Sequence, residues 1–351
     1  MNQSFSYMLI FKVKGEIFMQ IGSGNHIYTW HEDWVKTPIT ISARKGWSHH
    51  GIVVSSDSEV YTGHPDDPVV QVFDMQGNFL RSWDSNCTDT HGMTLVKEGD
   101  VEYIWIADNG AKRRPSTGYE YSSDQKQIIG QVIKTSLDGD VVMKLVTPPV
   151  NSYLNGDYKP TWVAVNENGN GDIWVADGYG ASEVHCFNKK GEYLLTINGE
   201  EGKQGHFDCP HAIFIDNRKT DPELYVADRS NSCVQVYDMD GNWKRVFGSE
   251  FLTSPSGFVV DGDYLVIAEL KARLTICDID DNYVVYLGDN GDVTNIQGWP
   301  NYHDIKGDSI RPELEEGKFN SPHGMAIDRE GNLFISEWLI GGRSIKLKKI
   351  S

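Results

Sequence analysis

Positive charge is scarce in this sequence. It carries 32 Lys and Arg residues against 50 Asp and Glu, which gives a formal net charge of −18. Phosphate backbones and anionic lipid headgroups repel such a chain, so the charge argues against sequence-independent nucleic-acid binding. A long hydrophobic run is also missing, because the N-terminal stretch YMLIFKV is short and lacks the cleavage-site pattern of a signal peptide. We therefore expect a soluble, cytoplasmic protein with no nucleic-acid partner and no membrane partner.

Cysteine is scarce too, and its spacing fits neither a metal site nor a set of disulfides. The five cysteines are an odd number, lie far apart and contain no CxxC pair. This pattern argues against a disulfide framework and against a thiolate zinc site. We interpret all five as free thiols: Cys87, Cys186, Cys209, Cys233 and Cys277.

What is abundant fits a β-sheet repeat. The 35 glycines and ten tryptophans are typical of folds with many tight turns and aromatic strand positions. Six units can be aligned, and each has an apolar strand, a Gly or Asp turn, and a second strand that ends in a small residue and a carboxylate. The units open at His50, His91, Thr161, His211, Ser256 and His323. The second strands end at Asp108, Asp177, Asp228, Glu269 and Glu337, whereas the first unit has His64 in that place.

The repeat predicts an all-β fold. Four short strands in each of six units indicate a six-bladed β-propeller with four-stranded antiparallel blades. The last unit runs out after its third strand, so we expect residues near 26 to 36 to supply the fourth and close the ring. Residues 19–351 would form this single domain, and residues 1–18 an N-terminal extension whose order the sequence leaves open. The long intervals between openings predict insertions near residues 109 to 130 and 287 to 318.

Alternation of strand direction places the entry loops and the loops after the second strands on one face of the propeller. Alternate blades lie about 120° apart in a six-bladed ring, and those blades carry His91, His211 and His323. Three converging imidazoles match a zinc site with an open fourth position. His50 breaks the three-fold spacing, so we place it among groups that contact substrate. The simpler interpretation is that each entry histidine bonds a neighbouring loop, and that the strand-end carboxylates cap loop amides.

These residues resemble those of the peptidyl-α-hydroxyglycine α-amidating lyases, zinc-dependent propellers with NHL repeats, and especially their stand-alone bacterial members. The resemblance covers the chain from about Gly22 through the motifs THGMTL, PHAIFI, PHGMAI, VADGYG and VADRSN. It implies zinc, or another divalent transition metal, on the histidines of the first three motifs. It also implies that Tyr179 acts as the catalytic base and that Arg229 holds the substrate carboxylate. The alternative for Arg229 is a salt bridge to Asp228.

Two departures from the family pattern affect what can be transferred. Pro65 follows His64 where the family has a second arginine, and Gly324 follows His323 where the family has the acid of a calcium site. We therefore do not predict calcium, and we look for another basic residue near the substrate. The second insertion offers Trp299, His303 and Arg311 as a lid, and Arg311 is our first choice for the missing arginine.

The first insertion is the runner-up source of positive charge, with Lys112, Arg113 and Arg114. The predicted substrate contacts are His50, His64, Trp299 and Arg311. The resemblance implies a small-molecule or peptide-like substrate whose carbinolamide C–N bond is cleaved to an amide and a glyoxylate-like product. Two alternatives stay open. One is a metal-dependent hydrolase or lactonase on a propeller, and the other is a non-catalytic scaffold of the NHL type that binds a protein.

Overall fold

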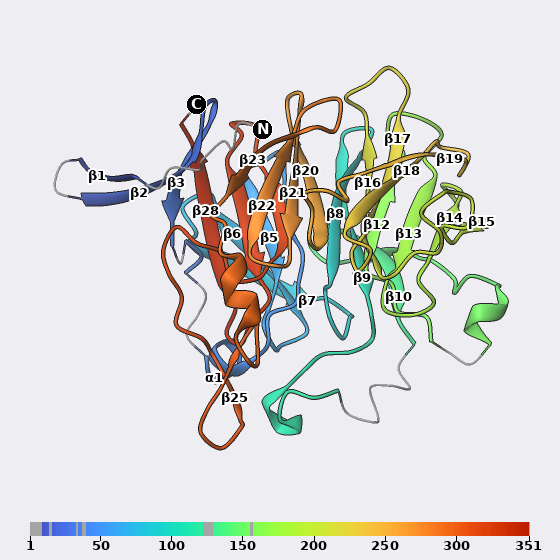
Figure 1. Ribbon diagram of the computed structural model, residues 1–351. Helices are drawn as coiled ribbons and strands as arrows, with labels where there is room; N and C mark the ends of the chain where they lie inside the picture. The colour runs from blue at the N-terminus through green and yellow to red at the C-terminus, as the bar shows by residue number, and fades with distance from the viewer. Residues whose placement is uncertain are drawn as a thin grey trace.

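The protein is a six-bladed β-propeller in a computed structural model that describes residues 9–13, 16–32, 34–36, 40–121, 129–154 and 157–350. The blades stand side by side around a central axis (Figure 1). The first blade contains β4 (Ile52–Val54), β5 (Glu59–Gly63), β6 (Val69–Asp74) and β7 (Phe79–Asp84). The second contains β8 (Gly92–Glu98), β9 (Val101–Asp108), β10 (Gln131–Ser136) and β11 (Val141–Lys144). The third contains β12 (Trp162–Val165), β13 (Ile173–Asp177), β14 (Glu183–Phe187) and β15 (Tyr193–Ile197). The next two are β16 (Pro210–Asp216), β17 (Glu223–Asp228), β18 (Cys233–Tyr237) and β19 (Trp243–Phe247); and β20 (Pro255–Asp261), β21 (Tyr264–Glu269), β22 (Arg273–Cys277) and β23 (Tyr283–Leu287).

The sixth blade confirms the predicted ring closure. It contains β26 (Pro322–Ile327), β27 (Leu333–Glu337) and β28 (Arg343–Lys349), and its fourth strand is the N-terminal β3 (His26–His31). β28 pairs antiparallel with β3, with Leu347 opposite Trp30. Joining the two ends of the chain in one sheet removes the free edges that an open ring of blades would expose.

A hairpin extends the sixth blade outward. β1 (Leu9–Val13) pairs with β2 (Glu16–Ser23), and β2 pairs with β3, so the sheet has six strands. Part of the predicted extension 1–18 therefore continues this sheet, while residues 1–8 lie outside the described residues.

The two predicted insertions are present on the lower face in Figure 1. The first carries the short helix η1 (Pro115–Thr117), and the second carries η4 (Gly291–Asn295), β24 (Tyr302–His303) and β25 (Ser309–Ile310). The described residues also contain the short helices α1 (Ile41–Lys45) and η3 (Asn151–Tyr153). No helix among the described residues is long and apolar enough to cross a membrane.

The core lies between neighbouring blades, where large side chains from the inner strands interlock. Trp105 in β9 and Trp174 in β13 are at most 1% exposed. Trp105 packs with Val163 and Phe187 in one buried cluster, and Trp174 belongs to another. Burying a large aromatic side chain stabilises a fold by roughly 2 to 3 kcal/mol relative to leaving it exposed. All five cysteines are buried and free, as the sequence predicts.

The carboxylates that end the second strands cap loop amides, which confirms the simpler interpretation of their role. Asp177 accepts the backbone N–H groups of Lys159 at 2.7 Å and Ala181 at 2.6 Å. Asp228 accepts the N–H of Asp208 at 2.8 Å. A buried N–H group without an acceptor costs about 1 to 3 kcal/mol, so these carboxylates fix the loops on the face that carries the insertions.

We expect Asp228→Ala to lower the free energy of unfolding by about 3 kcal/mol, because the buried carboxylate also holds the side chains of Asn231 at 2.8 Å and Gln235 at 2.9 Å. Asp238→Ala is the matched control, since Asp238 accepts two amides in a solvent-accessible turn, and we expect it to cost about 1 kcal/mol or less. Urea titration of both variants measures the difference. Equal costs would show that strand-end carboxylates are no more important than ordinary turn residues.

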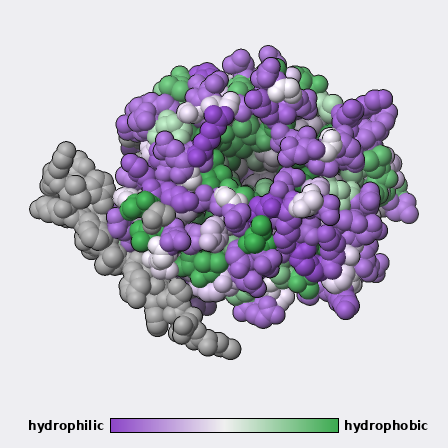
Figure 2. Space-filling model, turned by 90° about the horizontal axis from the view of Figure 1, so that it is seen from above, coloured by the Kyte–Doolittle hydropathy of each residue, from purple (hydrophilic) through white to green (hydrophobic). Residues whose placement is uncertain are grey.

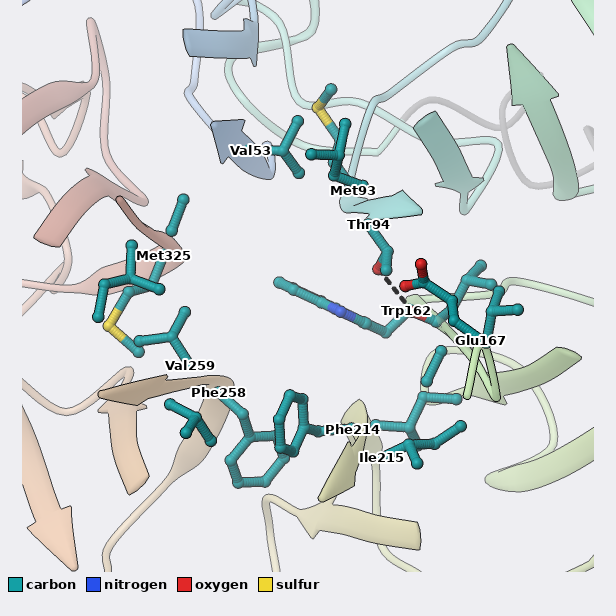
Figure 3. A pocket seen from close by; sticks show the side chains of 18 of the residues that line it. Val53, Met93, Thr94, Trp162, Glu167, Phe214, Ile215, Phe258, Val259 and Met325 are labelled. Carbon is teal, nitrogen blue, oxygen red and sulfur yellow. Dashed lines mark hydrogen bonds between the residues drawn. The ribbon is translucent and has the colours of Figure 1, made fainter. Parts of the chain in front are cut away.

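The channel along the axis is apolar on the face opposite the insertions. Figure 2 views that face and shows hydrophobic side chains around a central hollow. The hollow is a cavity of about 630 Å³ between the first strands of the blades. Figure 3 shows the Trp162 indole lying across the middle of it. The same indole lies 6.5 Å from the His211 ring, centroid to centroid, so Trp162 separates this cavity from the histidines on the other side.

Candidate functional site

Backbone irregularities aim the entry histidines into the channel. The pairing of β16 with β17 shifts register between Pro210 and Ala212, which leaves His211 as the extra residue, and β26 shifts in the same way around His323. A bulge of this kind frees one residue from the ladder and redirects its side chain. Gly324 follows His323 because a Cβ at that position would lie 2.6 Å from the carbonyl oxygen of the neighbouring blade.

The histidines of alternate blades meet on the axis, as the sequence predicts for their repeat position. The ring centroids of His91, His211 and His323 lie 4.6 to 5.0 Å apart. A fourth imidazole, His49, joins them at 4.4 Å from His91 and 4.7 Å from His323. One nitrogen from each of His49, His91 and His323 lies within 4.8 Å of the others, and all three side chains are buried.

Hydrogen bonds fix the tautomers of two of these imidazoles. The Nδ1 of His91 lies 2.7 Å from the carbonyl oxygen of Thr161, and the Nδ1 of His211 lies 2.9 Å from that of Ser256. A carbonyl oxygen only accepts, so both Nδ1 atoms carry hydrogen and both Nε2 atoms present a lone pair to the channel. The entry residues of two blades that lack a histidine thus orient the histidines of the blades before them.

His49 is oriented by a carboxylate. Its Nδ1 lies 3.0 Å from Asp89 Oδ2, and the other oxygen of Asp89 lies 3.4 Å from the ammonium group of Lys112. Burial disfavours ionisation of Asp89, but Lys112 and His49 outweigh it and hold the pKa of Asp89 below its usual value. A carboxylate behind an imidazole is the usual arrangement for a metal-ligating histidine. His323, by contrast, has no hydrogen-bond partner for Nδ1 among the described residues.

The donor set fits a cation. Burial lowers the pKa values of all four imidazoles, so they are neutral near pH 7. The Tyr179 hydroxyl lies 3.1 to 3.2 Å from the Nε2 atoms of His49, His91 and His211, yet it has one proton to donate. The Nε2 atoms of His91 and His323 also face each other at 3.1 Å. A surplus of buried imidazole lone pairs is the chemistry of a zinc site with three histidines.

Tyr179 and Arg229 come together beside the histidines. Tyr179 lies in the turn after β13 and Arg229 follows β17, and the Nη1 of Arg229 lies 3.3 Å from the tyrosine oxygen. The guanidinium also lies 5.4 Å from the centroid of the tyrosine ring. Burial raises the pKa of Tyr179, and the charge of Arg229 opposes that rise. No salt bridge of Arg229 appears among the described residues, because Asp228 points to its own loop instead.

A cavity of about 350 Å³ opens from this cluster to the face with the insertions. The part of the cavity nearest the histidines is lined by Tyr179, Arg229, His49 and Trp338. Its remaining walls are Asn109, Ala111, Arg113, Tyr121, Lys159 and Leu270.

The structure places His50 and His64 away from this cavity. His50 lies 3.2 Å from the hydroxyl of Ser48 and lines a separate cavity between the first and sixth blades. Burial lowers the pKa of His50 to about 3. His64 caps a turn, since its Nδ1 accepts the N–H groups of Asp66 and Asp67.

The lid residues also lie outside the cavity. Trp299 donates to the carbonyl oxygen of Asn320 at 3.0 Å and its ring lies 6.1 Å from that of Trp338, so it packs behind the cavity wall. Arg311 donates to the carbonyl oxygen of Ile340 at 2.8 Å. The basic residue from an insertion that lines the cavity is Arg113, from the runner-up segment.

The sequence patterns predict neither His49 nor Trp338 as lining residues, and they do not predict Lys159 or Tyr121. The doubled histidine in WSHHGIVV was the available signal for His49, because both residues stand at the entry of the first blade. Trp338 directly follows the strand-end Glu337, as Arg229 follows Asp228. The repeat position that supplies the arginine in the fourth blade therefore supplies an aromatic wall in the sixth.

The sequence matches no family model. It is similar to the human NHL repeat-containing protein 3, with 28% identity over 270 residues that cover 71% of this chain and 73% of that protein. It is also similar to a probable peptidyl-alpha-hydroxyglycine alpha-amidating lyase of Caenorhabditis elegans, with 29% identity over 150 residues, and to peptidyl-alpha-hydroxyglycine alpha-amidating lyase 1 of Drosophila melanogaster, with 38% over 90 residues. These matches cover 42% and 22% of this chain, and 36% and 15% of the two lyases.

Among solved structures, a streptogramin B lyase has a TM-score of 0.54 at 14% identity, with 92% of this chain and 97% of that chain covered. At this identity the likeness supports the propeller fold alone. The relatives named as amidating lyases confirm the resemblance inferred from the sequence motifs.

Proposed function

We propose that the protein is a zinc-dependent lyase that cleaves the carbinolamide C–N bond of an N-acyl-α-hydroxyglycine, releasing an amide and glyoxylate. The observation that carries the proposal is the convergence of three neutral, buried imidazoles, those of His49, His91 and His211, on the hydroxyl of Tyr179, with Arg229 beside it. Two relatives named as amidating lyases support the reaction class.

His91, His211 and His323 would hold the metal, with His49 next to them. A bound divalent cation would supply Lewis-acid stabilisation of the negative charge that develops on the substrate oxygen. The same positive charge, together with Arg229, would favour the phenolate of Tyr179 against the effect of burial. The backbone carbonyl groups of Thr161 and Ser256 keep two of the imidazoles in the tautomer that binds a cation.

The chain's own residues then account for the proton movements. The Tyr179 phenolate takes the proton of the substrate hydroxyl, the C–N bond breaks as the C=O bond of glyoxylate forms, and the same proton passes from Tyr179 to the amide nitrogen. Arg229 presents two parallel N–H groups that match a carboxylate.

The reaction itself is testable with purified, zinc-loaded protein. We expect N-benzoyl-α-hydroxyglycine to give benzamide and glyoxylate in equal amounts, measured by chromatography and a coupled glyoxylate assay. Protein treated with a chelator is the control, and it is expected to lose this activity and to recover it with added zinc. A zinc-loaded protein that forms no glyoxylate but opens esters or lactones would replace the proposal with the hydrolase alternative. Protein that binds no metal would favour the scaffold alternative.

A further inference from the structure

The cavity above the histidines is positively charged in a protein that is strongly acidic overall. Three cationic side chains line it, Arg113, Lys159 and Arg229, and no Asp or Glu is among its described lining residues. The chain as a whole has 50 acidic residues against 32 basic ones. Cationic groups gathered in a concave site without counter-charges raise the local concentration of anions.

Arg113 forms no ion pair with the residues that the structure describes, and aromatic rings surround it. Its guanidinium lies 4.8 Å from the ring centroid of Trp47, 4.9 Å from that of Tyr121 and 5.9 Å from that of Trp338. Its Nε is buried and has no hydrogen-bond partner among the described residues. Aromatic faces orient a guanidinium but do not neutralise its charge. The neighbouring arginine of the same insertion differs, because Arg114 is paired with Asp66 at 3.1 Å.

Lys159 and Arg229, like Arg113, lack a carboxylate partner among the described residues. Neither forms a salt bridge with a carboxylate in the part of the chain that the structure describes. Lys159 lies two residues before Thr161, and its backbone N–H, not its ammonium group, is bonded to Asp177. One carboxylate on Arg229 would leave the charges of Arg113 and Lys159 unbalanced within a cavity of about 350 Å³. Partly desolvated cations attract an anion more strongly than exposed ones do.

We infer that this cavity selects a small dianionic ligand, with one carboxylate on Arg229 and a second anionic group on Arg113 and Lys159. The inference rests on the proposed function for the position of the reacting bond, and it adds that the acyl part of the substrate is itself acidic. The aromatic wall of Trp338 and Tyr121 packs against the apolar atoms between the two anionic groups.

Two inert probes of equal length separate charge from size. N-succinylglycine carries carboxylates at both ends, whereas N-butyrylglycine carries one, and neither has the hydroxyl group needed for reaction. Titration calorimetry at low salt is expected to show at least tenfold tighter binding of N-succinylglycine, by both zinc-loaded and chelator-treated protein. The preference should shrink as salt is added, since ions screen the second charge.

Matched variants assign the preference to residues. Arg113→Gln and Lys159→Gln are each expected to reduce it to about threefold or less, and Arg113→Lys should retain most of it. Arg329→Gln, at an exposed turn on the opposite face, is the control and should change nothing. Thermal melting checks that each variant is folded. Equal affinity for the two probes, or a preference that survives both glutamine variants, would overturn the inference. A clear dianion preference in a zinc-loaded protein that forms no glyoxylate from N-succinyl-α-hydroxyglycine or from N-benzoyl-α-hydroxyglycine would support the inference and reject the lyase proposal.

Discussion

Alanine in place of His91, His211 or His323 is expected to reduce bound zinc from about one per chain to about a tenth of that or less, because three imidazoles provide nearly all of the binding energy of such a site. The side chains are at most 1% exposed, and two of them, His91 and His323, belong with His49 to the close group of ligand atoms found among the described residues. Elemental analysis of purified protein by mass spectrometry measures the loss. Melting temperature and circular dichroism show whether each variant keeps the propeller.

His50→Ala is the matched control for this experiment. His50 stands at the same repeat position, is also buried, with 5% of its surface exposed, and contacts Ser48 rather than the cluster. We expect it to retain full zinc content. Full occupancy in all three alanine variants would reject the site, and zinc loss in His50→Ala equal to theirs would mean that the repeat position has structural importance only.

His49→Ala decides which histidines bind the ion. The nitrogen atoms that lie closest as a set belong to His49, His91 and His323, whereas the spacing of the blades favours His211 over His49. If His49 is a neighbour rather than a ligand, its replacement should weaken zinc binding by about tenfold, as the loss of a supporting group does. Complete loss in His49→Ala together with retention in His211→Ala would exchange the two.

The fold was predictable because each blade repeats the same alternation of apolar and polar residues, so one unit supports the interpretation of the next. The closure of the ring followed from counting, since the last unit has three strands and the first is preceded by an extra one. The repeat also located His91, His211 and His323, because a residue at a fixed position points to the same place in each blade whose backbone follows the repeat, and His50 is the exception. These predictions depend on periodicity and on little else.

The parts of the site that the sequence did not predict lie where the periodicity ends. Whether His49 or His50 reaches the axis depends on the backbone course before β4, and the repeat specifies only the residue next to Gly51. Arg311 and Trp299 belong to a long insertion, and their positions depend on contacts with the carbonyl groups of Ile340 and Asn320 that no spacing reveals. Arg113 reaches the cavity because aromatic side chains from its own insertion and from two distant segments surround it.

Tyr179→Phe is expected to retain zinc and lose on the order of 100-fold or more in kcat, the usual contribution of a positioned acid or base. The substitution removes only the oxygen atom that lies between the imidazoles and Arg229, so substrate binding and the ring contacts should persist. Arg229→Lys should instead raise KM about tenfold with a smaller change in kcat, because an ammonium replaces a two-pronged donor for the substrate carboxylate. Steady-state kinetics of glyoxylate release measure both, with zinc content as the check on each variant. The two effects differ in kind because one residue handles the proton and the other holds the substrate. Unchanged kcat in a zinc-loaded Tyr179→Phe protein would remove the base from the mechanism and leave the imidazoles, with Arg229, as the groups that act on the substrate.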